Sequence, residues 1–142
     1  MPILYHGTNR AFATAMAGTP AAGGTVDVTR GRGEFGRGFY TQDSTGNAAR
    51  RGQGIYGDNS AVLILNIDNL AYHALNFRRL NLNMARRLDA QLRASHMQHA
   101  YTTVHDAIIG PLVGMPGIEQ QKFQTQNART LLNGPLTQRT VK

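Results

Sequence analysis

The sequence contains no cysteine and no long run of apolar residues. Without cysteine the chain can form neither disulfides nor thiolate metal sites. The longest apolar run, AVLILNI at 61–67, has the length of a β-strand and falls well short of the ~18 residues that a membrane-spanning helix needs. No secretory signal pattern precedes the first motif. These absences predict a protein that has no membrane segment.

Acidic residues and lysines are also scarce. The chain has eight acidic residues, of which only Glu34 and Glu119 are glutamates, against fifteen basic residues, and its net charge is +7. Thirteen of the basic residues are arginines. A guanidinium group binds phosphate through paired hydrogen bonds and stacks on flat rings, which an ammonium group does not do. The composition indicates a polyanionic partner, either nucleic acid or an acidic inhibitor protein; a solvated helix face is the plainer explanation.

The length and the residue patterns predict one domain over 1–142, of the α+β class. Helical and strand patterns mix without strict βαβ alternation, which favours an antiparallel or mixed sheet. Met84, Leu88 and Leu92 are spaced by four and predict one stripe of a long helix. We expect strands at 2–7, 38–41, 60–68, 105–111 and 120–125, with a possible one at 25–29. We expect helices at 9–18, from a cap at 43–45 to 51, at 80–101 and at 127–134.

The stretch LYHGT, residues 4–8, combines two groups that suit a nucleotide. His6, at a strand end, can donate a hydrogen bond to a ribose hydroxyl. Gly7 has no side chain, so its N–H and C=O are open to a planar carboxamide, which both donates and accepts. An isolated histidine is more often an ordinary core residue, so this stretch alone does not identify a site.

The stretch GRGFYTQD, residues 36–43, supplies complementary groups. The ring of Tyr40 offers a face on which a second flat ring can stack. The flanking glycines let the backbone pass close to it. Arg37, and also Arg30 or Arg32, could pair with a pyrophosphate. With LYHGT, these groups describe a site for a nicotinamide dinucleotide without a Rossmann fold.

LYHGT followed by GEFGRGFYTQD resembles the first two motifs of the ADP-ribosyltransferase superfamily, in the His-Tyr branch that includes diphtheria toxin and the poly-ADP-ribose polymerases. HDAIIGPLVGMPGIEQQKFQTQNARTLL, at 105–132, is similar to the C-terminal half of small bacterial members. The resemblance implies a split, mostly antiparallel sheet with flanking helices, and NAD as co-substrate in the cleft between its halves. It also implies a bacterial polymorphic-toxin domain, secreted and acting in the target-cell cytoplasm during interbacterial competition, with an acidic cognate immunity protein.

By this resemblance, His6 binds the adenosine-side ribose or orients NAD, Gly7 holds the nicotinamide amide, and Tyr40 stacks on nicotinamide. The other cofactor-binding residues expected beside them are Thr8, Gly38, Phe39, Arg37 and Arg32.

The third family motif usually supplies a glutamate, which bonds the nicotinamide-ribose 2′-hydroxyl and stabilises the cationic charge as nicotinamide leaves. Here the strand reads EQQKFQT, and the resemblance places Gln120 in that catalytic position; Glu119 takes it if the register differs by one. Side chains alternate along a strand, so Gln120 and Lys122 share a face opposite Phe123. If Phe123 faces the core, the Gln120 face could look into the cleft.

A glutamine can hold a ribose hydroxyl, but it cannot supply a full negative charge or act as a general base. The charge could instead come from Glu34 in the GEFG loop, from Asp106 or from Glu119. If these glutamines are ordinary strand residues, the enzyme would be inactive.

Three functions stay open at this point. The first is a mono-ADP-ribosyltransferase toxin domain acting on a macromolecular acceptor, with RNA ahead of protein because of the arginines. The second is an NAD glycohydrolase, and the third is a nucleic-acid-binding module that uses RGRGEFGRGF as an arginine-glycine-aromatic segment. His96 and His99 lack a nearby carboxylate, so no metal site is expected. The residues expected to bind the acceptor are Arg78, Arg79, Arg86 and Arg87.

Overall fold

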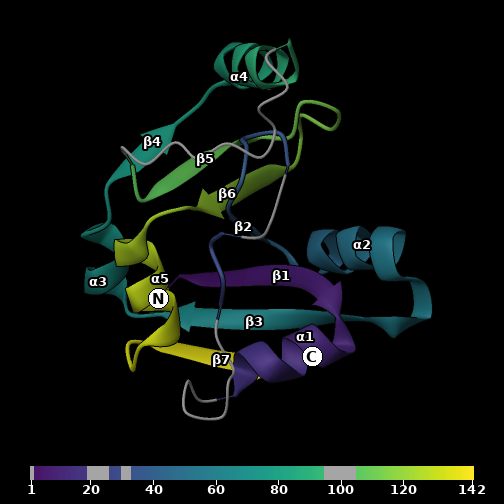
Figure 1. Cartoon of the computed structure of the whole chain (residues 1–142), viewed down its shortest axis with the longest axis vertical. Coiled ribbons are helices and arrows are strands. Elements are labelled where there is room, and N and C mark those ends of the chain that lie inside the picture. Colours follow the sequence, from purple (N-terminus) through teal and green to yellow (C-terminus); the bar gives the residue numbers. More distant parts are fainter. Residues whose placement is uncertain (1, 19–25, 30–32, 95–104) are drawn as a thin grey trace. The chain divides into compact units, whose positions relative to one another are not determined.

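A computed structural model describes residues 2–18, 26–29, 33–94 and 105–142 (Figure 1). Within these ranges it contains five α-helices and seven strands of a mixed sheet. The α+β class predicted from the sequence is therefore confirmed. The chain divides into two compact units, which are described one at a time, and the expectation of a single domain over 1–142 stays a prediction.

The first unit consists of Met1–Val26, Thr41–Ala74 and Thr130–Lys142. Its strands are antiparallel, in the order β1 (Ile3–Asn9), β3 (Ser60–Ile67) and β7 (Thr137–Val141) (Figure 1). The end of a further strand, β2 (Phe39–Gln42), pairs with β1 at the residues Tyr5 and Gln42. The predicted strand at 60–68 is thus confirmed, and its leucines at 63 and 65 are fully buried.

Helices of the first unit begin at side-chain caps. Asn9 accepts a hydrogen bond from Phe12 N at 2.7 Å and starts α1 (Arg10–Ala17). Ser44 accepts one from Asn47 N at 3.1 Å and starts α2 (Thr45–Tyr56). Such caps satisfy backbone N–H groups that have no partner within the helix. The predicted ends at Gly18 and at a cap within 43–45 are both confirmed.

Helix α1 packs against β3 and β7, whereas α2 packs against β1 and β3. A short helix, α3 (Asn69–His73), follows β3 and is capped by Asp68. Arg139 of β7 donates to the carbonyl oxygens of Met16 and Leu132, at 3.0 and 2.8 Å, so one guanidinium group satisfies the ends of two helices.

The second unit consists of Asp27–Tyr40 and Leu75–Arg129. Strand β4 (Phe77–Arg79) runs parallel to β5 (Ala107–Pro111), and β6 (Glu119–Phe123) runs antiparallel to β5. Its helix is α4 (Leu82–Ala94). Two elements are shared between the units: β2, and the final helix α5 (Gln126–Asn133).

The core of the second unit gathers residues from α4, the strands and the glycine-rich segment. Helix α4 contributes Ala85, Leu88 and Leu92. The predicted stripe is wrong at Met84, which is 42% exposed, because the helix turns the small Ala85 inward instead. The whole cluster comprises Phe35, Tyr40, Leu80, Ala85, Leu88, Leu92 and Ile108, with Val113 packed against it.

The possible strand at 25–29 is also wrong for its described part. Residues 26–29 form a turn in which the Asp27 carboxylate accepts from Thr29 N at 2.8 Å. This side-chain bond offers the backbone an alternative to a strand ladder.

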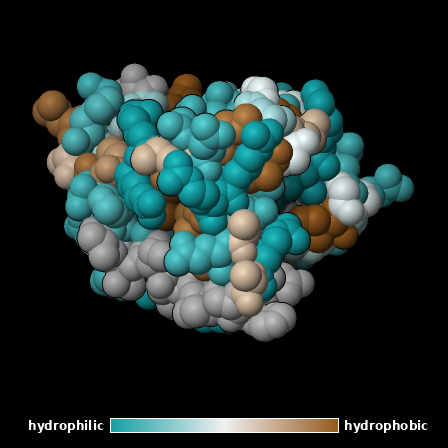
Figure 2. Space-filling model, turned by 90° about the horizontal axis from the view of Figure 1, so that it is seen from above, coloured by the Kyte–Doolittle hydropathy of each residue, from teal (hydrophilic) through white to brown (hydrophobic). Residues whose placement is uncertain are grey.

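Large hydrophobic side chains are exposed at separate points, and the face drawn in Figure 2 is mostly hydrophilic with small hydrophobic areas between. Separate apolar side chains of this kind are normal for a protein surface. Among the described residues, the helices are too short or too polar to cross a bilayer.

Candidate functional site

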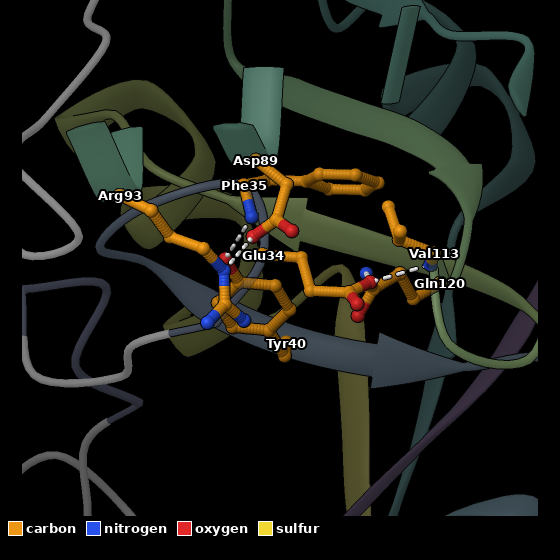
Figure 3. Close-up of polar contacts among 7 residues, drawn as sticks. All are labelled: Glu34, Phe35, Tyr40, Asp89, Arg93, Val113 and Gln120. Carbon is orange, nitrogen blue, oxygen red and sulfur yellow. Dashed lines mark hydrogen bonds and ion pairs between the residues drawn. The ribbon is translucent and has the colours of Figure 1, made fainter. Parts of the chain in front are cut away.

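The GEFG turn, residues 33–36 in the second unit, is held by its own backbone and by Tyr40. Gly36 N donates to Gly33 O at 3.1 Å, and Gly36 has a φ of 87°, which a side chain would strain. The Tyr40 hydroxyl accepts from Phe35 N at 3.0 Å and donates to Gly36 O. The aromatic residue of the motif therefore supports the turn that precedes it (Figure 3).

Strand β6 holds the same turn through two side chains on one of its faces. Gln120 Nε2 lies 3.3 Å from Glu34 Oε1, and Lys122 Nζ donates to Phe35 O at 2.7 Å. A third donor, Val113 N, lies 2.8 Å from Glu34 Oε1 (Figure 3). Because all three donors meet adjacent residues, the glycine-rich segment and β6 form one polar cluster inside the second unit.

Gln120 is 1% exposed, and its two amide atoms differ in their surroundings. Only Nε2 can donate to a carboxylate, so Nε2 faces Glu34 and Oε1 is turned away. Within the described part of the chain, Oε1 is buried without a hydrogen-bond partner. A buried acceptor of this kind costs free energy, which is why such atoms are rare in proteins.

Glu34 is half-buried, and its two oxygens also differ. Both donors, Val113 N and Gln120 Nε2, meet Oε1. No residue that the structure describes donates to Oε2. The carboxylate is thus held at one oxygen and available at the other.

Lys122 is fully buried beside this turn. Burial lowers the pKa of its amine from 10.5 to about 7, because the charged form loses its hydration. Its stem passes directly under Gly38: a Cβ at Gly38 would lie 2.4 Å from Lys122 Cγ. This close approach gives a packing reason for Gly38, while its predicted role toward NAD stays a prediction.

Both faces of β6 are buried, and the expectation that the Gln120 face looks into a cleft stays a prediction. Phe123 is fully buried, as expected for the core face, but Gln120 and Lys122 on the other face are buried as well. The GEFG turn covers them, through the bonds to Glu34 and Phe35.

Gly7 and its neighbours lie on β1 in the first unit. A Cβ at Gly7 would lie 1.9 Å from Ala48 O of α2, so the glycine lets this helix approach the strand. The direction of the Gly7 backbone follows from Val62, its partner on β3. Lys142 N donates to Val62 O, so the N–H and C=O of Val62 point toward β7. Opposite residues of antiparallel strands alternate between hydrogen-bonded and non-hydrogen-bonded pairs. Gly7 and Val62 are therefore a non-hydrogen-bonded pair, and Gly7 directs its N–H and C=O away from β3.

The other predicted NAD-binding residues are placed as follows. His6 is half-buried on β1, and Thr8 is 4% exposed. Tyr40 is 4% exposed with its ring in the core cluster, so a ligand could stack on it only after a neighbour moves. Phe39 is buried and Arg37 is half-buried. Arg32 and Arg30 lie outside the described residues, and the roles of the whole set stay predictions.

The predicted acceptor-binding arginines are all exposed in the second unit. Arg78 and Arg79 lie on β4, and Arg86 and Arg87 lie on α4. None of the four forms a salt bridge with another described residue. Their neighbour Arg93, in contrast, pairs with Asp89 at 3.0 Å (Figure 3).

The alternative carboxylates differ from Glu34. Glu119 is exposed at the start of β6. Asp106 accepts hydrogen bonds from Asn76 N, Thr125 Oγ1 and Asn127 Nδ2, so both of its oxygens are engaged. Burial alone would raise the pKa of Asp106, but these hydrogen bonds hold it below its ordinary value. Asp106 therefore links the segments around Asn76 and around Thr125 within the second unit.

Lys122 and Val113 are the site residues that the sequence reasoning missed. Nothing in EQQKF marks the lysine as buried, and Val113 acts through its backbone N–H, which any residue except proline would supply. The described residues form no cluster of three potential metal ligands; His96 and His99 lie outside them.

The sequence matches no protein-family model and no curated protein.

Proposed function

We propose that the chain is an NAD-dependent mono-ADP-ribosyltransferase domain of the toxin type. The observation that carries the proposal is the 3.3 Å distance between Gln120 Nε2 and Glu34 Oε1, two residues 86 positions apart. The motif resemblance assigns the glycine-rich segment and the glutamine strand to one site. Their meeting inside one compact unit supports that assignment (Figure 3).

The strand β1 adds a second line of support. The Gly7 backbone groups point away from β3, so the ladder with that strand does not use them and they can bind a carboxamide in this proposal. Gly7 and the half-buried His6 beside it keep their proposed roles toward NAD.

Glu34 resolves the chemical difficulty of a glutamine in the catalytic position. As nicotinamide leaves with the electron pair of the C1′–N bond, the ribose gains positive charge, which a nearby carboxylate stabilises. Gln120 cannot provide this charge, but it holds the carboxylate of Glu34. In this proposal the amide and the carboxylate act together.

The acceptor is proposed to be RNA ahead of protein. The exposed arginines on β4 and α4 have no described salt-bridge partner, so their guanidinium groups are available to phosphates. An acidic immunity protein would use the same complementarity of charge. Secretion, and action in the cytoplasm of a target cell, belong to the proposal through the resemblance alone.

The test uses NAD labelled in its adenylate half, incubated with the purified chain and either RNA or protein. We expect label in the RNA and release of nicotinamide. Release of free ADP-ribose alone would favour the NAD glycohydrolase. Unchanged NAD under all conditions would overturn the proposal.

His6→Ala serves as the matched variant for the third alternative. We expect it to lower nicotinamide release with little change in melting temperature. The nucleic-acid-binding module would be favoured by a different result. The wild-type chain would leave NAD unchanged, and it and the His6→Ala variant would bind RNA equally well.

A further inference from the structure

We infer that Glu34 is the carboxylate that accepts the proton of the acceptor, and that Gln120 is a positioning residue for it. This inference rests on the proposed function and names which side chain of the site does the proton transfer. It assigns the general base to the GEFG turn, whereas the resemblance places the catalytic residue on the β6 strand.

The GEFG turn holds Glu34 on a rigid backbone. Its backbone groups are engaged by Gly33 O, the Tyr40 hydroxyl and Lys122 Nζ. Phe35 is fully buried, which anchors the turn from inside. Glu34 is therefore a partly exposed side chain carried on a fixed backbone, as catalytic groups need to be.

The two oxygens of the Glu34 carboxylate differ in their partners. Oε1 receives Val113 N at 2.8 Å and Gln120 Nε2 at 3.3 Å, whereas Oε2 has no described partner. Val113 itself belongs to a hairpin loop closed by Leu112 N to Ile118 O at 2.8 Å. Two donors at one oxygen fix the orientation of the group and leave Oε2 to meet a proton.

The other carboxylates of the second unit differ from Glu34 in their partners. Asp106 has both oxygens engaged, and Asp89 pairs with Arg93. Glu119 is exposed at the end of a strand, and no described residue donates to it. Asp27 Oδ1 accepts from Thr29, and Asp89 Oδ1 from Arg93, so their donors lie two and four residues away along the chain. Glu34 differs in that both donors to its held oxygen come from distant segments, 79 and 86 residues away.

In the proposed transfer, NAD loses nicotinamide and the acceptor loses one proton. The C1′–N bond of NAD breaks, and its electron pair goes to the nicotinamide ring nitrogen. The oxygen of an acceptor hydroxyl or of water forms the new bond to C1′. Its proton passes to Glu34 Oε2 and from there to solvent.

The experiment measures nicotinamide release from NAD by the whole chain as a function of pH. Glu34→Gln should lose roughly 10²–10⁴-fold, because an amide cannot take the proton. If Glu34 takes the proton, the wild-type rate should decline toward acid pH, and the Glu34→Gln rate should lack this decline. The variant's amide oxygen can still accept from Val113 N, so the fold should be kept. Asp89→Asn, the same kind of change at a surface ion pair, should leave the rate unchanged.

Gln120 is tested by two variants. Gln120→Ala should reduce the rate less than Glu34→Gln does and keep the pH dependence. Gln120→Glu puts a second carboxylate beside Glu34, and the pair should retain a proton. Its acid decline should move to higher pH. A purely structural glutamine would instead lower the melting temperature of Gln120→Ala and leave the nicotinamide-release rate of the folded variant at the wild-type level.

A rescue experiment covers the case in which Glu34→Gln fails to fold. Formate added to Glu34→Ala should restore part of the rate by occupying the two donors. Absence of rescue in a folded Glu34→Ala protein, or a Glu34→Gln protein with wild-type rate and pH profile, overturns the inference. A wild-type chain that releases no nicotinamide overturns the proposed function instead.

Discussion

Lys122 places an amine in a fully buried position, where its described partner is the carbonyl oxygen of Phe35. Its stem fills the space left by Gly38, so the residue serves packing along its length and hydrogen bonding at its tip. The charged form loses its hydration there, which lowers the pKa of the amine to about 7.

This burial predicts how stability depends on pH. Below about pH 7 the folded and unfolded chains both carry the proton, so this group adds no slope there. Between about 7 and 10.5 the unfolded chain holds a proton that the folded chain has released. Stability should therefore rise with pH in this window, by at most about 1.4 kcal/mol per pH unit.

Urea denaturation at a series of pH values from neutral to mildly alkaline measures the effect. Lys122→Met keeps the stem and removes the titrating amine, so we expect its stability to lack this rise. Equal pH slopes in the two proteins would show that Lys122 stays charged in the fold.

At the scale of the element, α2 depends on two glycines in opposite ways. Gly7 of β1 faces this helix, and a Cβ there would lie 1.9 Å from Ala48 O and 2.9 Å from Gly52 N. Gly54, on the helix itself, has no atom within 4 Å of a Cβ. The two positions therefore make a matched pair for the same substitution.

Gly7→Ala should destabilise the protein by roughly 1–3 kcal/mol or more, because backbone atoms of α2 would have to move. Gly54→Ala should stabilise it by about 0.5–1 kcal/mol, since alanine loses less entropy in a helix. Thermal unfolding of both variants decides the point. A neutral Gly7→Ala would mean that α2 can shift, and the variant would then report on NAD binding alone.

Element boundaries were predictable where a local signal marks them. The caps at Asn9 and Ser44 and the end at Gly18 depend on nearby residues, and the predicted helices match there. Helix α3, strand β4 and strand β7 were missed. Strand β4 has only three residues, FRR, and its pairing with β5 comes from a distant segment.

The candidate site was predictable in its residues but not in its interactions. The motifs indicated Gln120, and Glu34 entered as one of several possible charges. Nothing in local sequence shows that the two lie 3.3 Å apart, because 86 residues separate them. The burial of Lys122 likewise depends on the turn that covers it.

At the scale of the whole molecule, the net charge of +7 does not show by itself where a polyanion binds. Two double substitutions of arginine distinguish a defined RNA-binding surface from a general effect of net charge. Arg86→Gln with Arg87→Gln removes two charges from α4, and Arg10→Gln with Arg50→Gln removes two from exposed positions of the first unit.

The α4 pair should weaken binding of a single-stranded RNA and flatten its salt dependence. The log–log slope should fall by roughly 0.7 for each phosphate that the protein no longer neutralises. The control pair should change the slope less. Filter binding between about 50 and 200 mM salt measures both. NAD hydrolysis should persist in each variant, and equal slopes for the two pairs would refute a defined acceptor surface on α4.

The division of the chain has a consequence for genetics. The first unit is assembled from three separate segments and the second from two, and both β2 and α5 continue from one unit into the other. No single stretch of the gene encodes either unit. Truncations that reach β2 from one end or α5 from the other would therefore remove part of an element that both units share. Loss of activity in such fragments would reflect loss of folding, so functional residues have to be mapped by point substitutions.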